Sequence, residues 1–356
     1  MNGTKKTVLA AIRSEALQAG GRAYSEKTWL NLGGKYLELR FATKALKERL
    51  LISVSCLECP EPGKSDLTIY VWTEAFGEKE PAFCQPFLRD MLWRGGSLFF
   101  KESVSLPFLF DGINKYFTAF DEERREGYYC LNEEKELPFL HICHPFRQIF
   151  HWWTLDISEY LLVHAAVVGL NGKGVGLVAV GGSGKSTTAI SALSRGLEFA
   201  GDDYVLFSQQ ERRALLVYST GYLNPDMLAL MPEFAESVIG RDPKRNDKTL
   251  IDLTALKSLF VKEMEVCALL HPVVGYEKPN IKPSEKSMRV ATALAASTTI
   301  QNEGWMDPKV LSKVFRCIKG IPIYEFQLSY DFAENAECLR NFILKRSGAN
   351  VHNEQS

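Results

Sequence analysis

Alternating apolar and polar positions dominate the first third of the chain. Within the run KYLELRFAT (35–43), the apolar-polar alternation of KYLELRF predicts a strand with one buried face and one solvated face. The other elements predicted here are a helix over 5–19 and strands at 50–58, 67–76, 97–103 and 115–120. We therefore expect a β-rich α+β domain over residues 1–140.

The periodicity changes near residue 141. Five apolar residues between 146 and 157 share one helical stripe, which predicts a packing helix that docks a second domain. The following order of strand, loop, helix and strand up to residue 207 is typical of an α/β layer. Later predicted elements are strands at 265–275 and 321–329, helices at 291–299 and 308–318, and a capped helix from Asp331. We expect an α/β domain over 141–346 and a loose polar tail over 347–356.

A glycine-rich loop joins the apolar run GVGLVAV to the helix-forming run KSTTAISALS. Residues 179–186 fit the pattern A/G-x-x-x-x-G-K-S/T. Glycines let backbone N–H groups converge on phosphate oxygens, and the following helix start adds positive potential. Lys185 is then expected to reach the β- and γ-phosphates of ATP, and the Ser186 hydroxyl to ligate Mg²⁺. The predicted nucleotide-binding residues are Gly181, Gly182, Ser183, Gly184, Lys185, Ser186 and Thr187.

Two adjacent carboxylates follow the next predicted strand. That strand, LEFA (197–200), is expected to run back alongside the strand before the loop, as in a βαβ crossover. Asp202 and Asp203 then lie at its carboxyl end, where open α/β sheets bind ligands. One carboxylate can hold Mg²⁺ while the other accepts the proton of an attacking hydroxyl.

His164 lies on the apolar run before the loop. Asn171–Gly172 is a preferred two-residue hairpin turn. With these residues at the tip, Leu170 faces Lys173 and His164 faces Ala179; a longer turn moves the partner of His164 to 180–182. Both registers place His164 at the base of the loop, although a histidine satisfied within the core is the alternative.

Other candidate groups have weaker patterns. Cys56 and Cys59 form a lone CxxC with no second pair, which disfavours a zinc site. The run HICH (141–144) with His151 could imitate a metal cluster, but we interpret these residues as packing at the domain junction. The charged segment 241–248 is either a solvated loop or a segment that brings Lys248 or an arginine to the transferred phosphate. The segment 283–289 has the same two interpretations.

Charge and composition narrow the class of partner. The chain has 42 basic and 43 acidic side chains and a formal net charge of −1, which predicts no nucleic-acid partner and no anionic membrane partner. The N-terminus lacks the apolar run of a signal peptide, and no run of about 18 apolar residues is present. The eight scattered cysteines are expected to be reduced thiols, and we expect a cytoplasmic protein. Homo-oligomerisation is left open.

The segment from VHAAVV through AVGGSGKSTTAISALSRGLEFAGDD resembles the HPr kinase/phosphorylase superfamily. The resemblance implies an α/β fold with a P-loop kinase domain of the HPr kinase/PEP carboxykinase-like type. It also implies that His164, Lys185 and Asp203 are catalytic, with Asp203 as the proton acceptor and Asp202 beside it. Ser186 and Asp202 would lie at the metal. The strong resemblance covers only about residues 160–208.

The chain departs from that family after the aspartate pair. HPr kinases carry an acidic metal ligand in an E-I-R-G stretch, whereas this region reads LLVYSTGYLNPDM. This puts in doubt HPr as the substrate and the reverse reaction; the reduced pattern resembles kinases of natural-product peptides, such as lasso-peptide precursors. The predicted function is an ATP- and Mg²⁺-dependent kinase of a serine-type hydroxyl on a peptide or small protein. The β-rich domain over residues 1–140 is then expected to recognise the acceptor. The alternatives are a kinase of a small-molecule hydroxyl and a nucleotide-binding regulator without phosphotransfer.

Overall fold

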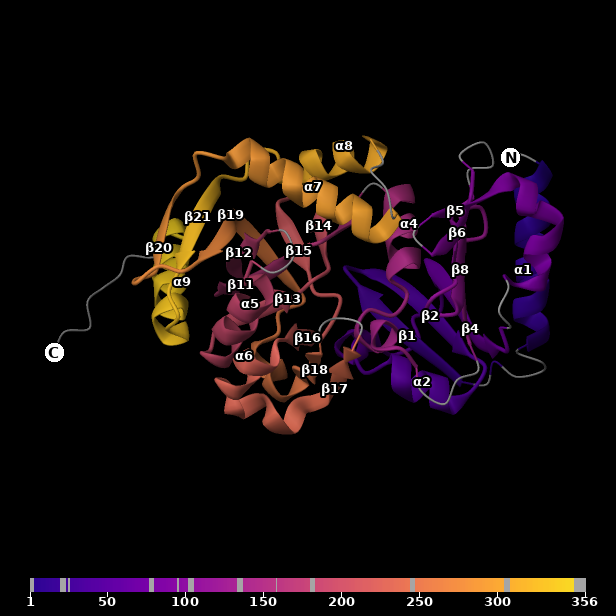
Figure 1. Ribbon diagram of the computed structural model, residues 1–356, viewed down its shortest axis with the longest axis horizontal. Helices are drawn as coiled ribbons and strands as arrows, with labels where there is room; N and C mark the ends of the chain where they lie inside the picture. The colour runs from indigo at the N-terminus through magenta and orange to yellow at the C-terminus, as the bar shows by residue number, and fades with distance from the viewer. Residues whose placement is uncertain are drawn as a thin grey trace. The chain divides into compact units, whose positions relative to one another are not determined.

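The chain is a mixed α/β protein with several sheets, seen in a computed structural model (Figure 1). Its contacts divide it into two units, Met1–Ile157 and Ser158–Ser356. The boundary predicted between residues 140 and 141 falls within α3 (Phe139–Cys143), whereas the first unit extends through α4 to Ile157. Among the described residues, no helix is long and apolar enough to cross a membrane. The structure describes residues 3–19, 24, 26–76, 80–94, 96–101, 106–132, 137–157, 159–179, 183–243, 247–303 and 308–348.

The first unit is built on a nine-stranded sheet with the order β3-β1-β2-β4-β9-β8-β7-β6-β5. Strands β2, β4 and β9 are parallel to one another, and the other neighbours are antiparallel. Its strands are β1 Glu26–Leu32, β2 Lys35–Phe41, β3 Glu58–Cys59, β4 Leu67–Glu74, β5 Met91–Arg94, β6 Ser97–Phe100, β7 Phe108–Asp111, β8 Tyr116–Asp121 and β9 Glu126–Asn132. Its helices are α1 Gly3–Ala19, α2 Lys44–Leu50, α3 Phe139–Cys143 and α4 Arg147–Asp156, with 3-10 turns η1 Ser55–Leu57 and η2 Ala82–Asp90.

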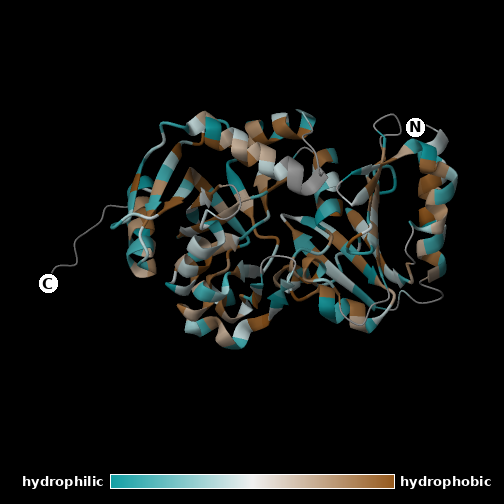
Figure 2. Ribbon diagram, in the orientation of Figure 1, coloured by the Kyte–Doolittle hydropathy of each residue, from teal (hydrophilic) through white to brown (hydrophobic). Residues whose placement is uncertain are grey.

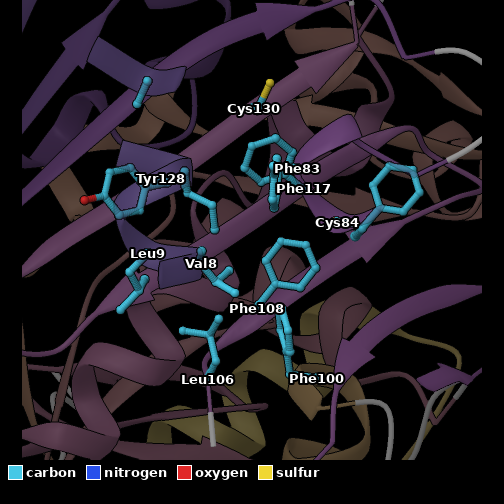
Figure 3. Close-up of a cluster of buried hydrophobic side chains, with 14 of the residues drawn as sticks. Val8, Leu9, Phe83, Cys84, Phe100, Leu106, Phe108, Phe117, Tyr128 and Cys130 are labelled. Carbon is cyan, nitrogen blue, oxygen red and sulfur yellow. The ribbon is translucent and has the colours of Figure 1, made fainter. Parts of the chain in front are cut away.

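An aromatic core fills the space between this sheet and α1. The buried residues Val8, Leu9, Ile12 and Ala16 share one face of α1. Figure 2 shows hydrophobic and hydrophilic segments alternating along that helix. Figure 3 shows this contact: Val8 and Leu9 lie beside aromatic and sulfur side chains of η2 and the sheet. The buried members from the rest of the unit are Tyr70, Trp72, Phe83, Cys84, Met91, Leu98, Phe100, Leu106, Phe108, Phe110, Phe117, Ala119, Tyr128 and Cys130.

The strand predicted at 50–58 is wrong. The segment contains the end of α2, a turn and η1, with β3 beginning only at Glu58. Its buried apolar residues are Leu50, Leu51, Val54 and Leu57, which follow a helical spacing of three to four. The Thr43 side chain accepts a hydrogen bond from Leu46 N at 3.3 Å and caps α2. This helix start favours helical structure, rather than a strand, at the beginning of the stretch.

The cysteine and histidine motifs of this unit lie in its packing. Cys56 and Cys59 are half-buried and form no disulfide, and the described residues contain no group of three or more His, Cys, Asp or Glu that could hold a metal ion. His141 is buried, and its Nδ1 lies within hydrogen-bond distance of the Tyr129 hydroxyl. Helix α4 packs against β8 of the same unit.

Glu15 of α1 gives the first unit a pH-dependent stability. Burial, and then the nearby Glu74, raise the pKa of Glu15 to about 7. The folded state therefore holds a proton that the unfolded chain releases, and stability falls as pH rises through 7. We expect Glu15→Gln to raise the free energy of unfolding at pH 8 by about 1–3 kcal/mol, with the gain fading toward pH 5.

Urea denaturation of the full chain at several pH values, followed by tryptophan fluorescence, measures this effect. The signal reports mainly the first unit, which holds Trp29, Trp72, Trp93, Trp152 and Trp153. Glu48→Gln on the exposed surface of α2 is the control. A Glu15→Gln gain of equal size at pH 5 and pH 8 would contradict the prediction.

The second unit has a mixed sheet with the order β10-β14-β15-β19-β12-β11-β13. Strand β21 also pairs with β19, and β20 pairs with β21. A separate three-stranded sheet has the order β16-β18-β17. The main-sheet strands are β10 Tyr160–Val163, β11 Ala166–Leu170, β12 Lys173–Leu177, β13 Glu198–Gly201, β14 Val205–Ser208, β15 Arg213–Leu215, β19 Glu263–Val274, β20 Asn280–Pro283 and β21 Ile323–Leu328. The remaining elements are α5 Lys185–Ser194, β16 Thr220–Leu223, α6 Pro225–Ala229, β17 Val238–Asp242, β18 Lys248–Asp252, α7 Ser287–Glu303, α8 Pro308–Ile318 and α9 Phe332–Arg346, with 3-10 turns η3 Pro232–Ser237 and η5 Thr254–Leu259.

The hairpin β11–β12 has the predicted register. Leu170 pairs with Lys173, and the ladder continues to Ala166 opposite Leu177. Asn171 and Gly172 both have positive φ, as a two-residue hairpin turn requires. Gly169 faces Gly174 across the ladder, and the Met264 sulfur occupies the space that a Cβ would fill at either glycine.

The predicted pairing of LEFA with the loop strand is wrong. Strand β13 pairs antiparallel with β11, while β12 lies between β11 and the parallel strand β19. The tight turn of the hairpin holds β11 directly against β12. Strand β13 therefore pairs with the other side of β11 rather than with β12. Because β11 reverses direction, β12 and β13 still end at the same edge of the sheet.

The described ends of the two charged segments lie in regular elements. Arg241 lies in β17, and Lys248 begins β18, where it pairs with Asp242. Residues 244–246 lie outside the described part of the chain. The segment 283–289 leads into α7. Contact of either segment with a phosphate stays a prediction.

Candidate functional site

Three separate segments bring the candidate residues to one edge of the main sheet. The glycine-rich loop follows β12, Asp202 and Asp203 follow β13, and His164 precedes β11. Because β11 is antiparallel to both other strands, its start lies at the edge where β12 and β13 end. The sheet topology therefore explains why these residues meet.

Lys185 is the centre of the cluster. It is the first residue of α5, and its Nζ lies 2.9 Å from Asp203 Oδ1 and 3.3 Å from Asp202 Oδ1. Burial lowers the pKa of Lys185, but the two carboxylates outweigh burial and raise it above the ordinary value. The ammonium group therefore stays charged and is available to an anion that displaces the carboxylates.

His164 faces the same carboxylate from the other side. Its Nε2 lies 3.5 Å from Asp203 Oδ1, and its ring is tilted against Tyr204 with centroids 5.5 Å apart. Burial lowers the pKa of His164, Lys185 lowers it further, and Asp203 opposes part of that shift. A neutral imidazole can accept a proton, which suits a partner of a general base.

Asp203 is held in an unusual backbone conformation. Its φ is 60°, and Tyr204 N donates to Asp202 O at 2.7 Å across it, forming a tight three-residue turn. Non-glycine residues with positive φ are uncommon, and such strain is concentrated at functional sites. The preceding Gly201 has φ 133°, and a Cβ there would come within 2.5 Å of Val205 Cγ1. Both carboxylates nevertheless contact the same ammonium group of Lys185.

Asp202 is the more deeply buried of the pair. Burial raises its pKa, while Lys185 and the Ser186 side chain favour the ionised form. Its Oδ2 is buried with no hydrogen-bond donor among the described residues. A buried carboxylate oxygen beside a serine hydroxyl fits one position of a hard cation, which in nucleotide sites takes only one or two protein ligands and completes its shell with phosphates and water.

The described part of the glycine-rich loop fits a phosphate. Gly184 has φ 90° and directly precedes α5, whose first N–H groups point out of the helix start. Ser183, Ser186 and Thr187 are half-buried there, and the buried Ser183 Oγ has no partner in the described chain. Gly181 and Gly182 lie outside the described residues.

Two residues absent from the predicted site lie at the same edge. His271 of β19 has its Nδ1 3.3 Å from Val178 O, one residue before the loop pattern begins. Thr298 of α7 accepts a hydrogen bond from His164 N at 3.1 Å. Neither residue is part of a recognisable motif, and Thr298 is 134 residues from His164 in sequence.

Comparisons with known proteins give little further information. No family model matches the sequence, and no curated protein sequence matches it. Among solved structures, the chain is similar to the Hpr(Ser) kinase/phosphatase from Coxiella burnetii, with 14% sequence identity over 52% of this chain and 99% of that chain. The TM-score is 0.28, so this likeness carries no argument about activity or site.

Proposed function

We propose that the second unit is an ATP- and Mg²⁺-dependent kinase with a P-loop of the HPr kinase-like type, and that it phosphorylates a serine-type hydroxyl on a peptide or small protein. One observation carries this proposal: the lysine at the start of α5 contacts two carboxylates, at 2.9 and 3.3 Å, and a neutral histidine lies 3.5 Å from the nearer of the two. The first unit is proposed to recognise the acceptor.

Lys185 has a different partner before and after nucleotide binding in this proposal. Without nucleotide, Asp202 and Asp203 neutralise it. The β- and γ-phosphate oxygens then compete for the ammonium group, and Lys185 exchanges one carboxylate for phosphate. This exchange leaves Asp203 facing His164 with its Oδ1 available to a hydroxyl.

Transfer then proceeds by in-line attack. The acceptor oxygen forms a bond to the γ-phosphorus, the bond from that phosphorus to the β-bridging oxygen breaks, and ADP leaves. The hydroxyl proton passes to Asp203, with neutral His164 stabilising the protonated carboxyl group. Ser186 and Asp202 would hold Mg²⁺, which supplies charge neutralisation at the phosphates.

The direct test is mass spectrometry of serine-containing peptides and small proteins incubated with the full chain, ATP and Mg²⁺. We expect a product heavier by one phosphoryl group that depends on acceptor, ATP and metal. Chelation with EDTA should abolish the product, and added Mg²⁺ should restore it.

The two rival functions give different products. A phosphorylated metabolite without any peptide product would support a small-molecule kinase. ATP binding with slow hydrolysis and no modified hydroxyl in any acceptor would support a nucleotide-binding regulator. Transfer that persists in EDTA would contradict the assigned roles of Ser186 and Asp202.

A further inference from the structure

His164 lies where the chain changes neighbours within the main sheet. Strand β10 pairs with β14, whereas β11 pairs with β12 and β13. Between them, Ala165 N donates to Val163 O at 3.0 Å, so His164 is the middle residue of a tight turn. The backbone N–H of His164 belongs to neither strand ladder and needs another acceptor.

Thr298 supplies that acceptor. Its side chain is fully buried, and its Oγ1 lies 3.1 Å from His164 N. Helix α7, which carries Thr298, packs against β10 and β21. A buried N–H without a partner is strongly unfavourable, so this hydrogen bond determines where the turn can lie relative to α7.

The position of the turn sets the position of the imidazole. The distance of 3.5 Å between His164 Nε2 and Asp203 Oδ1 is at the outer limit of a hydrogen bond, so a displacement of a few tenths of an ångström decides whether it forms. In many catalytic histidines the second ring nitrogen is held by a carbonyl or carboxylate. Here, among the described residues, Nδ1 of His164 has no hydrogen-bond partner. The orientation of the ring is therefore set by its backbone and by packing against Tyr204.

We propose that Thr298 is a positioning residue for the transfer reaction: its hydroxyl anchors the His164 turn and holds the imidazole against Asp203. This inference rests on the proposed kinase function for its kinetic consequence. Helix α7 thereby becomes part of the catalytic framework although it contributes no group to the reacting atoms.

The kinetic test compares Thr298→Val, which removes the hydroxyl at similar size, with Thr298→Ser, which keeps it. We expect Thr298→Val to lower kcat for acceptor phosphorylation by about 10- to 100-fold, with KM for ATP within about twofold. Thr298→Ser should retain most of the activity. Equal losses in both variants, or a loss confined to KM, would overturn the assignment.

A double variant separates positioning from general loss of stability. If Thr298 acts through His164, then Thr298→Val should have little further effect on kcat in a His164→Ala background. An undiminished effect in that background would show that Thr298 supports the fold rather than the histidine, and would overturn the proposal.

A spectroscopic measurement keeps this inference separate from the proposed function. The chain has six histidines, so the ring signals of histidine-labelled protein can be assigned with a His164 variant. Without any acceptor, Thr298→Val should shift the His164 ring signal, and Thr298→Ser should leave it close to wild type. An unshifted signal in Thr298→Val contradicts positioning, whereas a shifted signal in a protein that phosphorylates nothing contradicts only the kinase function.

Discussion

Asp203→Asn is expected to lower kcat for acceptor phosphorylation by about 10²–10⁴-fold, the usual contribution of a general base. Asparagine keeps the size of the side chain but cannot take up the hydroxyl proton. The same change removes one of the two carboxylates that hold Lys185. Nucleotide phosphates then face less competition, so the affinity for ATP should stay the same or increase. Steady-state kinetics with calorimetric ATP titration measures both effects.

The direction of the change in affinity makes this prediction specific. A variant that loses ATP affinity together with activity would mean that Asp203 contacts the nucleotide or its metal. Asp202→Asn should behave differently, with a raised requirement for Mg²⁺. Glu236→Gln, an exposed acid of the same unit, is the matched control and should change neither quantity.

Lys185→Met is expected to abolish transfer, lowering kcat/KM by at least about 10²–10³-fold, because the phosphates lose the buried cation that stabilises their developing charge. The change also leaves Asp202 and Asp203 close together without the cation that both contact. Removing one partner of a buried ion pair costs about 3–5 kcal/mol, so the second unit should unfold at lower temperature. Kinetics and circular dichroism melting measure the two losses.

A second substitution separates the stability effect of Lys185 from its catalytic effect. Lys185→Met combined with Asp202→Asn leaves one carboxylate in place of two, which relieves the repulsion. We expect the melting temperature to recover in part while transfer stays absent. Recovery of transfer in the double variant would show that Lys185 acts only as a counter-ion of the carboxylates.

The local structure around the candidate site could be predicted from short stretches of sequence. The turn at Asn171–Gly172 and the register of its hairpin follow from residues that tolerate positive φ. Asp331 caps α9 by accepting from Ala333 N and Glu334 N, which the sequence pattern also indicates. Where two local signals compete, as at 50–58, apolar content alone predicts a strand and the helix cap of α2 decides otherwise.

The meeting of His164, Lys185 and Asp203 was only partly predictable. Their spacing indicates that they approach one edge of a sheet, but it also suggested that β13 lies beside β12, whereas β11 separates them. The ion pair of Lys185 with both carboxylates and the direction of each pKa shift depend on burial by distant segments. A single sequence carries no measure of that burial.

The sequence by itself determined the elements whose causes lie within a few residues: the hairpin turn, the glycine-rich loop with its helix start, and the caps. Only the tertiary structure decided which strands are neighbours, which carboxylate faces the histidine and that α7 reaches His164 through Thr298. The physical reason is range. Turn chemistry and periodicity act between residues that are close in sequence. Strand order and burial arise from contacts between segments far apart along the chain. Because many different spacings in sequence lead to the same contact in space, the sequence spacing alone does not predict these contacts.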